Sequence, residues 1–203
     1  DLTGIEYFTK LKTLDCSGTG ITLLDVSKNT ALTNLDCMSN NITSLDVRSN
    51  ANLEWLRCSA TQIQDLDVSN NKNLKELYCH NEQYLKNLNV KGATALEELD
   101  CYDNVNLTSL DVSENINLTG LYCYNTMIEE LNLSQNTKLK NLNCMGNTKL
   151  KSLDLSYSNN WENVILKNTS LAYVNFGENG SSNFDSYQKS DLIPIELAIT
   201  EDT

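Results

Sequence analysis

The residues of this 203-residue chain best suited to chemistry are its seven cysteines, since a thiol can form a disulfide, ligate a metal or act as a nucleophile. Successive cysteines are 21, 21, 21, 22, 22 and 21 residues apart, so the chain has no CxxC pair of the kind that binds zinc. An odd number cannot all pair. The spacing therefore predicts a structural column of buried free thiols, a cysteine ladder, at Cys16, Cys37, Cys58, Cys79, Cys101, Cys123 and Cys144.

The acidic side chains are the second set of residues that could do chemistry. The formal net charge is −12, which excludes nucleic acid as a partner because phosphate backbones are repelled. One acidic column recurs in every repeat and could form a stripe for Ca²⁺, an ion that needs about six to eight converging oxygens. We favour a solvated face that preserves solubility, or local hydrogen bonds to the side chains of turn Ser and Asn residues. The column consists of Asp25, Asp46, Asp67, Asn89, Asp111, Asn132 and Asp154.

A catalytic function has little support in the sequence. Glu76 and Glu98 occupy equivalent positions in adjacent repeats, where their carboxyl groups could approach the spacing of about 5 Å found in retaining glycosidases. Such a coincidence is expected among 27 acidic residues. The single histidine, His80, has no obvious acid–base partner. We therefore predict a protein that is not an enzyme and that needs no cofactor or metal.

A repeat of 21 to 22 residues must position all these side chains. Each unit contains two half-motifs, LxxLxC and IxxLxV, and eight units run from Leu11 to Phe176. Alternation within each half-motif indicates two short strands per unit, with room between them for little more than a helical turn. A unit this small cannot bury its apolar residues alone, but stacked units form one continuous core. The central column is Leu14, Leu35, Leu56, Leu77, Leu99, Leu121, Leu142 and Val164.

The repeat also divides the chain. Residues 1–10 are predicted to be a partial N-terminal unit, and residues 11–176 the repeat array. Residues 177–203 are predicted to be a C-terminal cap or the start of a following domain, since the open end of such a core must be covered. Single-residue insertions after Cys79, Cys101 and Cys144 fall at one corner, which predicts a tolerant surface turn there.

The LxxLxCxxNxI motif at this period resembles the leucine-rich repeats of bacterial internalins and related surface proteins. The resemblance implies an α/β leucine-rich-repeat solenoid that is right-handed, curved and predominantly β with little helix. It implies that the LxxLxC strands form the concave sheet. It also implies an exported or surface-attached binding protein. The usual asparagine after the cysteine strand is present as Asn40, Asn104 and Asn147 and is replaced by Thr19, Thr61, Glu82 and Thr126.

The outward positions of the cysteine strands vary more than any other column and include large aromatics in units three to six. Because these positions share one strand face, with neighbouring units about 4.8 Å apart, we predict an exposed patch there. Trp, Tyr and Arg are favoured at recognition surfaces. Cross-strand stacking that only stabilises the sheet is the alternative. The candidate ligand-binding residues are Trp55, Arg57, Glu76, Tyr78, His80, Glu98, Tyr102, Tyr122 and Tyr124.

Together these features predict a secreted or cell-surface recognition module, adhesin-like, that binds a protein ligand with the cysteine-strand face. Two alternatives remain open: a carbohydrate-binding protein that uses the same aromatics, and a structural stalk that binds nothing. No stretch approaches about 18 continuous apolar residues, so no membrane insertion is expected in this segment.

Overall fold

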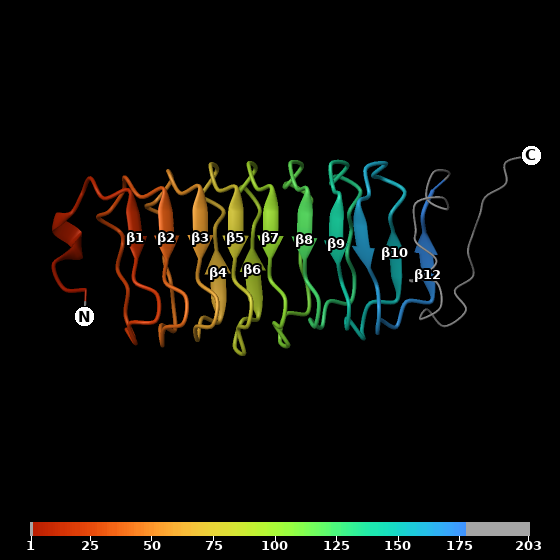
Figure 1. The fold of residues 1–203 in the computed structure, drawn as a ribbon, viewed down its shortest axis with the longest axis horizontal. Coiled ribbons are helices and arrows are strands. Elements are labelled where there is room, and N and C mark those ends of the chain that lie inside the picture. Colours follow the sequence, from red (N-terminus) through yellow and green to blue (C-terminus); the bar gives the residue numbers. More distant parts are fainter. Residues whose placement is uncertain (1, 178–203) are drawn as a thin grey trace, which may run out of the picture.

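The computed structural model describes residues 2–177, which form a parallel β-solenoid of about eight turns (Figure 1). Helix is almost absent: within the described residues the only one is a short 3-10 turn, η1 (Ile5–Tyr7), in the segment predicted to be a partial unit. That helix is neither long nor apolar enough to cross a membrane. The predicted cap lies outside the described residues except for Gly177. The predicted solenoid of about eight units with little helix is confirmed.

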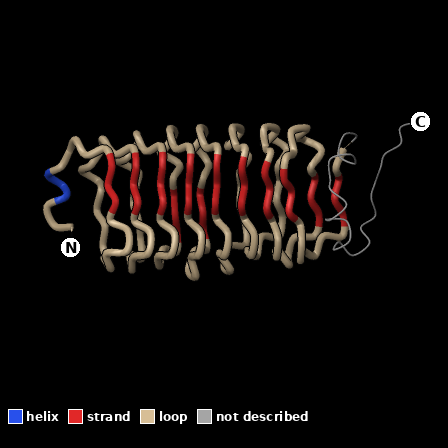
Figure 2. The backbone as a smooth tube through the Cα atoms, in the orientation of Figure 1, coloured by secondary structure: helices blue, strands red, loops and turns tan. Residues whose placement is uncertain are grey.

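The cysteine half-motifs form one eight-stranded parallel sheet, which runs along the whole array (Figures 1 and 2). Each strand is three residues long, and the central Leu or Val of each strand pairs with that of the next, as the sequence columns predict. In spatial order the strands are β1 (Thr13–Asp15), β2 (Asn34–Asp36), β3 (Trp55–Arg57), β5 (Glu76–Tyr78), β7 (Glu98–Asp100), β8 (Gly120–Tyr122), β9 (Asn141–Asn143) and β11 (Asn163–Ile165).

The prediction of a second strand in every unit is wrong for half of the units. Within residues 2–177, the second half-motifs pair regularly only between β4 (Asp65–Asp67) and β6 (Asn87–Asn89), and between β10 (Ser152–Asp154) and β12 (Tyr173–Asn175). Their arrows point opposite to those of the main sheet (Figure 1). Both pairs place an Asp opposite an Asn, whereas units one to three would place Asp25, Asp46 and Asp67 opposite one another. Like charges directly opposite disfavour close pairing in units one to three. Charge does not account for the units between β6 and β10, where Asn89, Asp111, Asn132 and Asp154 alternate and the structure also shows no regular pairing.

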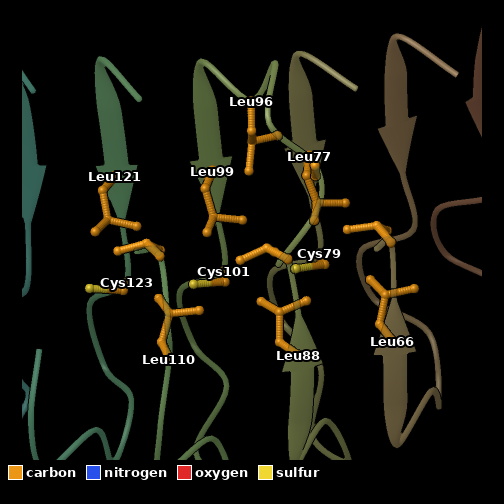
Figure 3. Packing of buried hydrophobic residues seen from close by; sticks show 14 of the residues in the cluster. Leu66, Leu77, Cys79, Leu88, Leu96, Leu99, Cys101, Leu110, Leu121 and Cys123 are labelled. Carbon is orange, nitrogen blue, oxygen red and sulfur yellow. The ribbon is translucent and has the colours of Figure 1, made fainter. Parts of the chain in front are cut away.

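The core lies between the two halves of each turn and is made of the predicted leucine and cysteine columns (Figure 3). All seven cysteines are buried and free. The backbone N–H of each cysteine donates to the next turn, for example from Cys37 to the Arg57 carbonyl at 2.9 Å. Burial raises the pKa of the thiols of Cys16, Cys37, Cys58, Cys79 and Cys101, to about 11 even at Cys16 in the first unit. The predicted buried thiols are therefore confirmed, and they behave as small apolar side chains.

The corner after each cysteine strand uses a left-handed backbone residue. The second residue after each cysteine, or after Leu166 in unit eight, has a φ between 53° and 72°. At Gly146 a Cβ atom would lie 2.1 Å from Asn125 Oδ1, so the Asn125 side chain of the previous turn would have to move to admit another residue there. This conformation turns the chain out of the sheet in every unit. The residues are Gly18, Ser39, Ala60, Asn81, Asp103, Asn125, Gly146 and Asn168.

A buried asparagine column closes the opposite corner, and our sequence analysis missed it. Each side-chain amide donates two hydrogen bonds to backbone carbonyls of the preceding turn; for Asn71 these reach Val47 at 3.1 Å and Asn50 at 2.8 Å. These bonds join successive turns where no strand ladder does. The signal was an Asn three residues after the IxxLxV valine or leucine, among 29 asparagines in the chain. The column contains Asn29, Asn50, Asn71, Asn115 and Asn136.

Candidate ligand-binding face

The predicted binding residues do lie together on the outer face of the main sheet. The strand register places Trp55, Glu76 and Glu98 in one row. A second row runs from Arg57 through Tyr78 and Asp100 to Tyr122. We call the surface formed by these rows and the residues that follow the cysteines the aromatic–acidic strip. It consists of Trp55, Arg57, Glu76, Tyr78, His80, Glu98, Asp100, Tyr102, Tyr122 and Tyr124.

The rings of the strip stack along the solenoid. His80 and Tyr102 have ring centroids 4.3 Å apart, and Tyr102 and Tyr124 are also 4.3 Å apart with an interplanar angle of 7°. Trp55 and Tyr78 form a tilted pair at 5.9 Å. The predicted exposed patch is therefore corrected to a half-buried one, because neighbouring rings cover each other's faces. Cross-strand stacking stabilises the sheet whether or not a ligand binds.

Arg57 is the single cation among the strip residues, and the protein itself uses its charge. Its guanidinium group forms an ion pair with the carboxylate of Asp36 on β2. The same group lies 5.6 Å from the centroid of the Trp55 ring, within the range of a cation–π contact. Asp36 and the Trp55 ring therefore hold Arg57 at the N-terminal end of the strip.

Tyr78 lies between the two glutamates. Its hydroxyl is 2.8 Å from Glu76 Oε2 and 3.0 Å from Glu98 Oε1. Burial and the two carboxylates raise the pKa of Tyr78, so the phenol keeps its proton at neutral pH. The adjacency of Glu76 and Glu98 expected from the sequence is present, but a neutral hydroxyl occupies the space that a glycosidase pair leaves for the sugar.

The next row holds His80 against Asp100. His80 Nδ1 lies 3.5 Å from Asp100 Oδ2, too long for a strong hydrogen bond. Burial lowers the pKa of His80 and raises the pKa of Asp100 to about 7. Asp100 Oδ1 is buried without a hydrogen-bond partner. The sequence analysis found no partner for His80 because Asp100 follows it by 20 residues.

The acidic column of the second half-motif forms local turns. In each unit the side-chain oxygen accepts a hydrogen bond from the backbone N–H two residues later, for example from Ser27 to Asp25 at 2.9 Å and from Ser113 to Asp111 at 3.0 Å. Local hydrogen bonding is therefore present, but its recurring donor is the backbone N–H and not the predicted Ser or Asn side chain. Between residues 2 and 177 no group of three or more His, Cys, Asp or Glu residues is arranged to hold a metal ion.

Glu82 is the unusual member of the asparagine positions that follow the cysteine strands. Its side chain is only 1% exposed, and its Oε1 accepts hydrogen bonds from the N–H and hydroxyl of Thr61 at 2.8 and 2.9 Å. Oε2 has no partner. Asn40, by contrast, also donates to the carbonyls of Cys16 and Cys37. Burial raises the pKa of Glu82 to about 7.

Comparison with known proteins agrees with this architecture. No protein-family model matches the chain, and no curated protein matches it. Among solved structures, the functional domain of internalin J from Listeria monocytogenes, which includes a cysteine ladder, shares 33% identity and a TM-score of 0.72. That match covers 88% of this chain and 43% of the internalin J chain. The chain has a leucine-rich-repeat fold and resembles the internalins.

Two further structures extend the comparison of this leucine-rich-repeat protein at the level of fold. An internalin, InlF, from Listeria monocytogenes has a TM-score of 0.61 at 17% identity, over 84% of this chain and 55% of that one. A leucine-rich-repeat protein from Leptospira interrogans has a TM-score of 0.50 at 18% identity, over 85% and 58%. The chain thus spans about half the length of the structures it matches, and their identities show the fold alone.

Proposed function

We propose that this leucine-rich-repeat protein is a non-enzymatic recognition module, secreted or held at a bacterial cell surface, that binds a protein ligand with the aromatic–acidic strip. Leucine-rich-repeat arrays are protein-interaction modules in general, because stacked repeats present one long continuous surface. The resemblance to internalin J supports the surface location. We propose in addition an adhesin-like role, in contact with host or other cell-surface molecules.

The strip carries the proposal because the repeats differ from one another there. The second half-motif presents an almost uniform row of Asp and Asn to solvent, engaged in its own turns. The strip instead gathers five large aromatics over four adjacent units, beside charged groups. Tyr and Trp on a rigid sheet are the residue types that dominate binding energy at protein interfaces. Carbohydrate binding by the same aromatics, and a stalk that binds nothing, are the alternative functions.

A set of alanine variants tests the proposal, using ligands found by screening a cell-surface protein array and a glycan array. Trp55→Ala, Tyr102→Ala and Tyr124→Ala should each cost only about 0.2 to 1 kcal/mol of stability, since none of these side chains fills the leucine core. One or two of them should weaken binding by about 2 kcal/mol or more, measured by calorimetry.

Asp46→Ala and Asp111→Ala on the uniform column are the matched controls and should leave binding unchanged. Normal binding by the three aromatic variants, together with loss in the two Asp variants, would overturn the proposal. A screen in which neither proteins nor glycans bind would favour the stalk.

A further inference from the structure

We propose that the aromatic–acidic strip binds a basic protein segment whose lysine or arginine side chains enter between Glu76, Glu98 and Asp100. The inference rests on the proposed function and deepens it by naming the chemical class of the partner. Three features of the strip carry it: the charges without internal counter-ions, the shortage of hydrogen-bond donors, and the orientation of the rings.

The centre of the strip is anionic and lacks an internal cation. Glu76 and Glu98 are direct neighbours on β5 and β7, and Asp100 lies one position further along β7. Across residues 2–177 no lysine or arginine forms an ion pair with any of the three. The nearest strip cation, Arg57, is already held by Asp36. Like charges directly opposite each other on a sheet are destabilising unless a counter-charge is supplied.

The centre of the strip has more hydrogen-bond acceptors than hydrogen-bond donors. The Tyr78 hydroxyl carries one proton and lies within hydrogen-bond distance of two carboxylates, so it can donate to only one of them at a time. Asp100 Oδ2 lies 3.5 Å from His80 Nδ1, too far for a strong hydrogen bond, so this oxygen can also accept from an added donor. An ammonium group brings three N–H donors and a guanidinium five, and such charge-assisted bonds are the strong ones. A basic side chain therefore supplies both the charge and the protons that this row lacks.

Ring orientation disfavours a sugar at the same place. A sugar ring packs against an open aromatic face, but Tyr102 has one face against His80 and the other against Tyr124, each at 4.3 Å. Trp55 is contacted by Tyr78 and by the Arg57 guanidinium. Tyr102 at the centre of the stack therefore presents mainly its edge to solvent. Ring edges pack well against the aliphatic stems of Lys and Arg, which stay in apolar contact while the charged head finds a carboxylate.

The charge of the whole chain points to the same class of partner. At a net charge of −12 the protein attracts a basic segment over long range and repels nucleic acids and acidic proteins. A bare metal ion fits less well, since the described residues hold no cluster of three metal-ligating side chains. A peptide can in addition cover the rings beside the carboxylates.

The test uses short random peptides displayed on phage and selected against the wild-type protein. Selected peptides should be enriched in lysine and arginine, and their affinity should fall as salt rises. Glu76→Gln combined with Glu98→Gln should weaken binding at least tenfold. Gln keeps an acceptor for Tyr78, so the fold should persist, which circular dichroism checks. The control, Glu129→Gln with Glu130→Gln, removes two charges from exposed positions in the second half of unit six and should change affinity less than twofold.

A complementary measurement leaves the protein unaltered: replacing the basic residues of a selected peptide by glutamine should abolish its binding to wild type. Selected peptides without basic enrichment, which lose binding to Tyr102→Ala but not to the Glu76/Glu98 variant, would overturn this inference and leave the proposed function standing. Peptides indifferent to every variant of the strip would overturn both. Equal weakening by the control pair would reduce the effect to non-specific charge attraction and would also overturn the inference.

Discussion

At the scale of single residues, we expect Glu82 to contribute a pH dependence to the stability of this protein. Its neighbours in the same column, Asn40 and Asn104, donate to cysteine carbonyls, but an ionised glutamate has no proton to donate. The hydroxyls of Thr19 and Thr126 each donate to a cysteine carbonyl, whereas that of Thr61 donates to Glu82. Glu82 is thus buried with one oxygen unpaired, and burial raises its pKa from 4.5 to about 7.

The sign of the pH effect follows from this shift. A carboxyl whose folded pKa lies above its unfolded pKa holds its proton more firmly in the folded state. Its contribution is complete below about pH 4.5 and is lost as the pH rises through 7. We expect the free energy of unfolding to fall by about 2 to 3 kcal/mol from this residue between pH 5 and pH 8. Glu82→Gln should remove that fall, as measured by urea denaturation across the range.

Asp100 needs a control, because burial also raises its pKa to about 7 and its contribution has the same sign. Asp100→Asn should therefore remove its own part of the slope and keep the part that belongs to Glu82. A wild-type slope retained in Glu82→Gln and lost entirely in Asp100→Asn would contradict the assignment to Glu82.

At the scale of the elements, asparagine side chains replace strand pairing at one corner of the solenoid. The second half-motif pairs regularly only in β4–β6 and β10–β12, yet its turns stay in register. Asn71 joins the turns by donating to the carbonyls of Val47 and Asn50. Asn71→Ala should destabilise the protein by about 2 to 4 kcal/mol, because two buried carbonyls lose a donor.

Asn70→Ala is the matched control for that substitution. Asn70 is the preceding residue, of the same type, and its side chain is exposed. Its replacement should change the unfolding free energy by less than about 0.5 kcal/mol. Equal effects of the two substitutions in thermal or urea unfolding would refute a structural role for the asparagine column.

At the scale of the whole molecule, the acidic surface should not depend on divalent cations. The Asp column is engaged in hydrogen bonds to its own turns, and exposed carboxylates are screened over about 8 to 10 Å at ordinary salt. Some members also have protein counter-ions, such as Lys91 for Asp111 at 2.8 Å. We expect EDTA to leave the Tm unchanged in scanning calorimetry. A fall of more than several degrees, reversed by added Ca²⁺, would show a cation site.

The sequence by itself determined the solenoid, because a constant period forces equivalent residues into columns. Once Leu35 and Leu56 are one period apart, parallel register follows, and with it the burial of the cysteines and the shared face of Trp55, Tyr78 and Tyr102. The sequence alone also showed that Glu82 replaces the asparagine that usually follows the cysteine strand. Periodicity positions side chains by unit and by face, to about the 4.8 Å spacing between strands.

Only the tertiary structure decided how neighbouring side chains are oriented and which hydrogen bonds they form within that spacing of about 4.8 Å. Whether a ring shows its face or its edge, whether Tyr78 reaches one glutamate or lies between two, and whether Glu82 finds a donor all depend on rotamers and on distances of an ångström or less. The same holds for the asparagine bonds that tie together residues 21 and 24 positions apart. These contacts join different turns, so they exist only once the turns are stacked, and no single repeat encodes them.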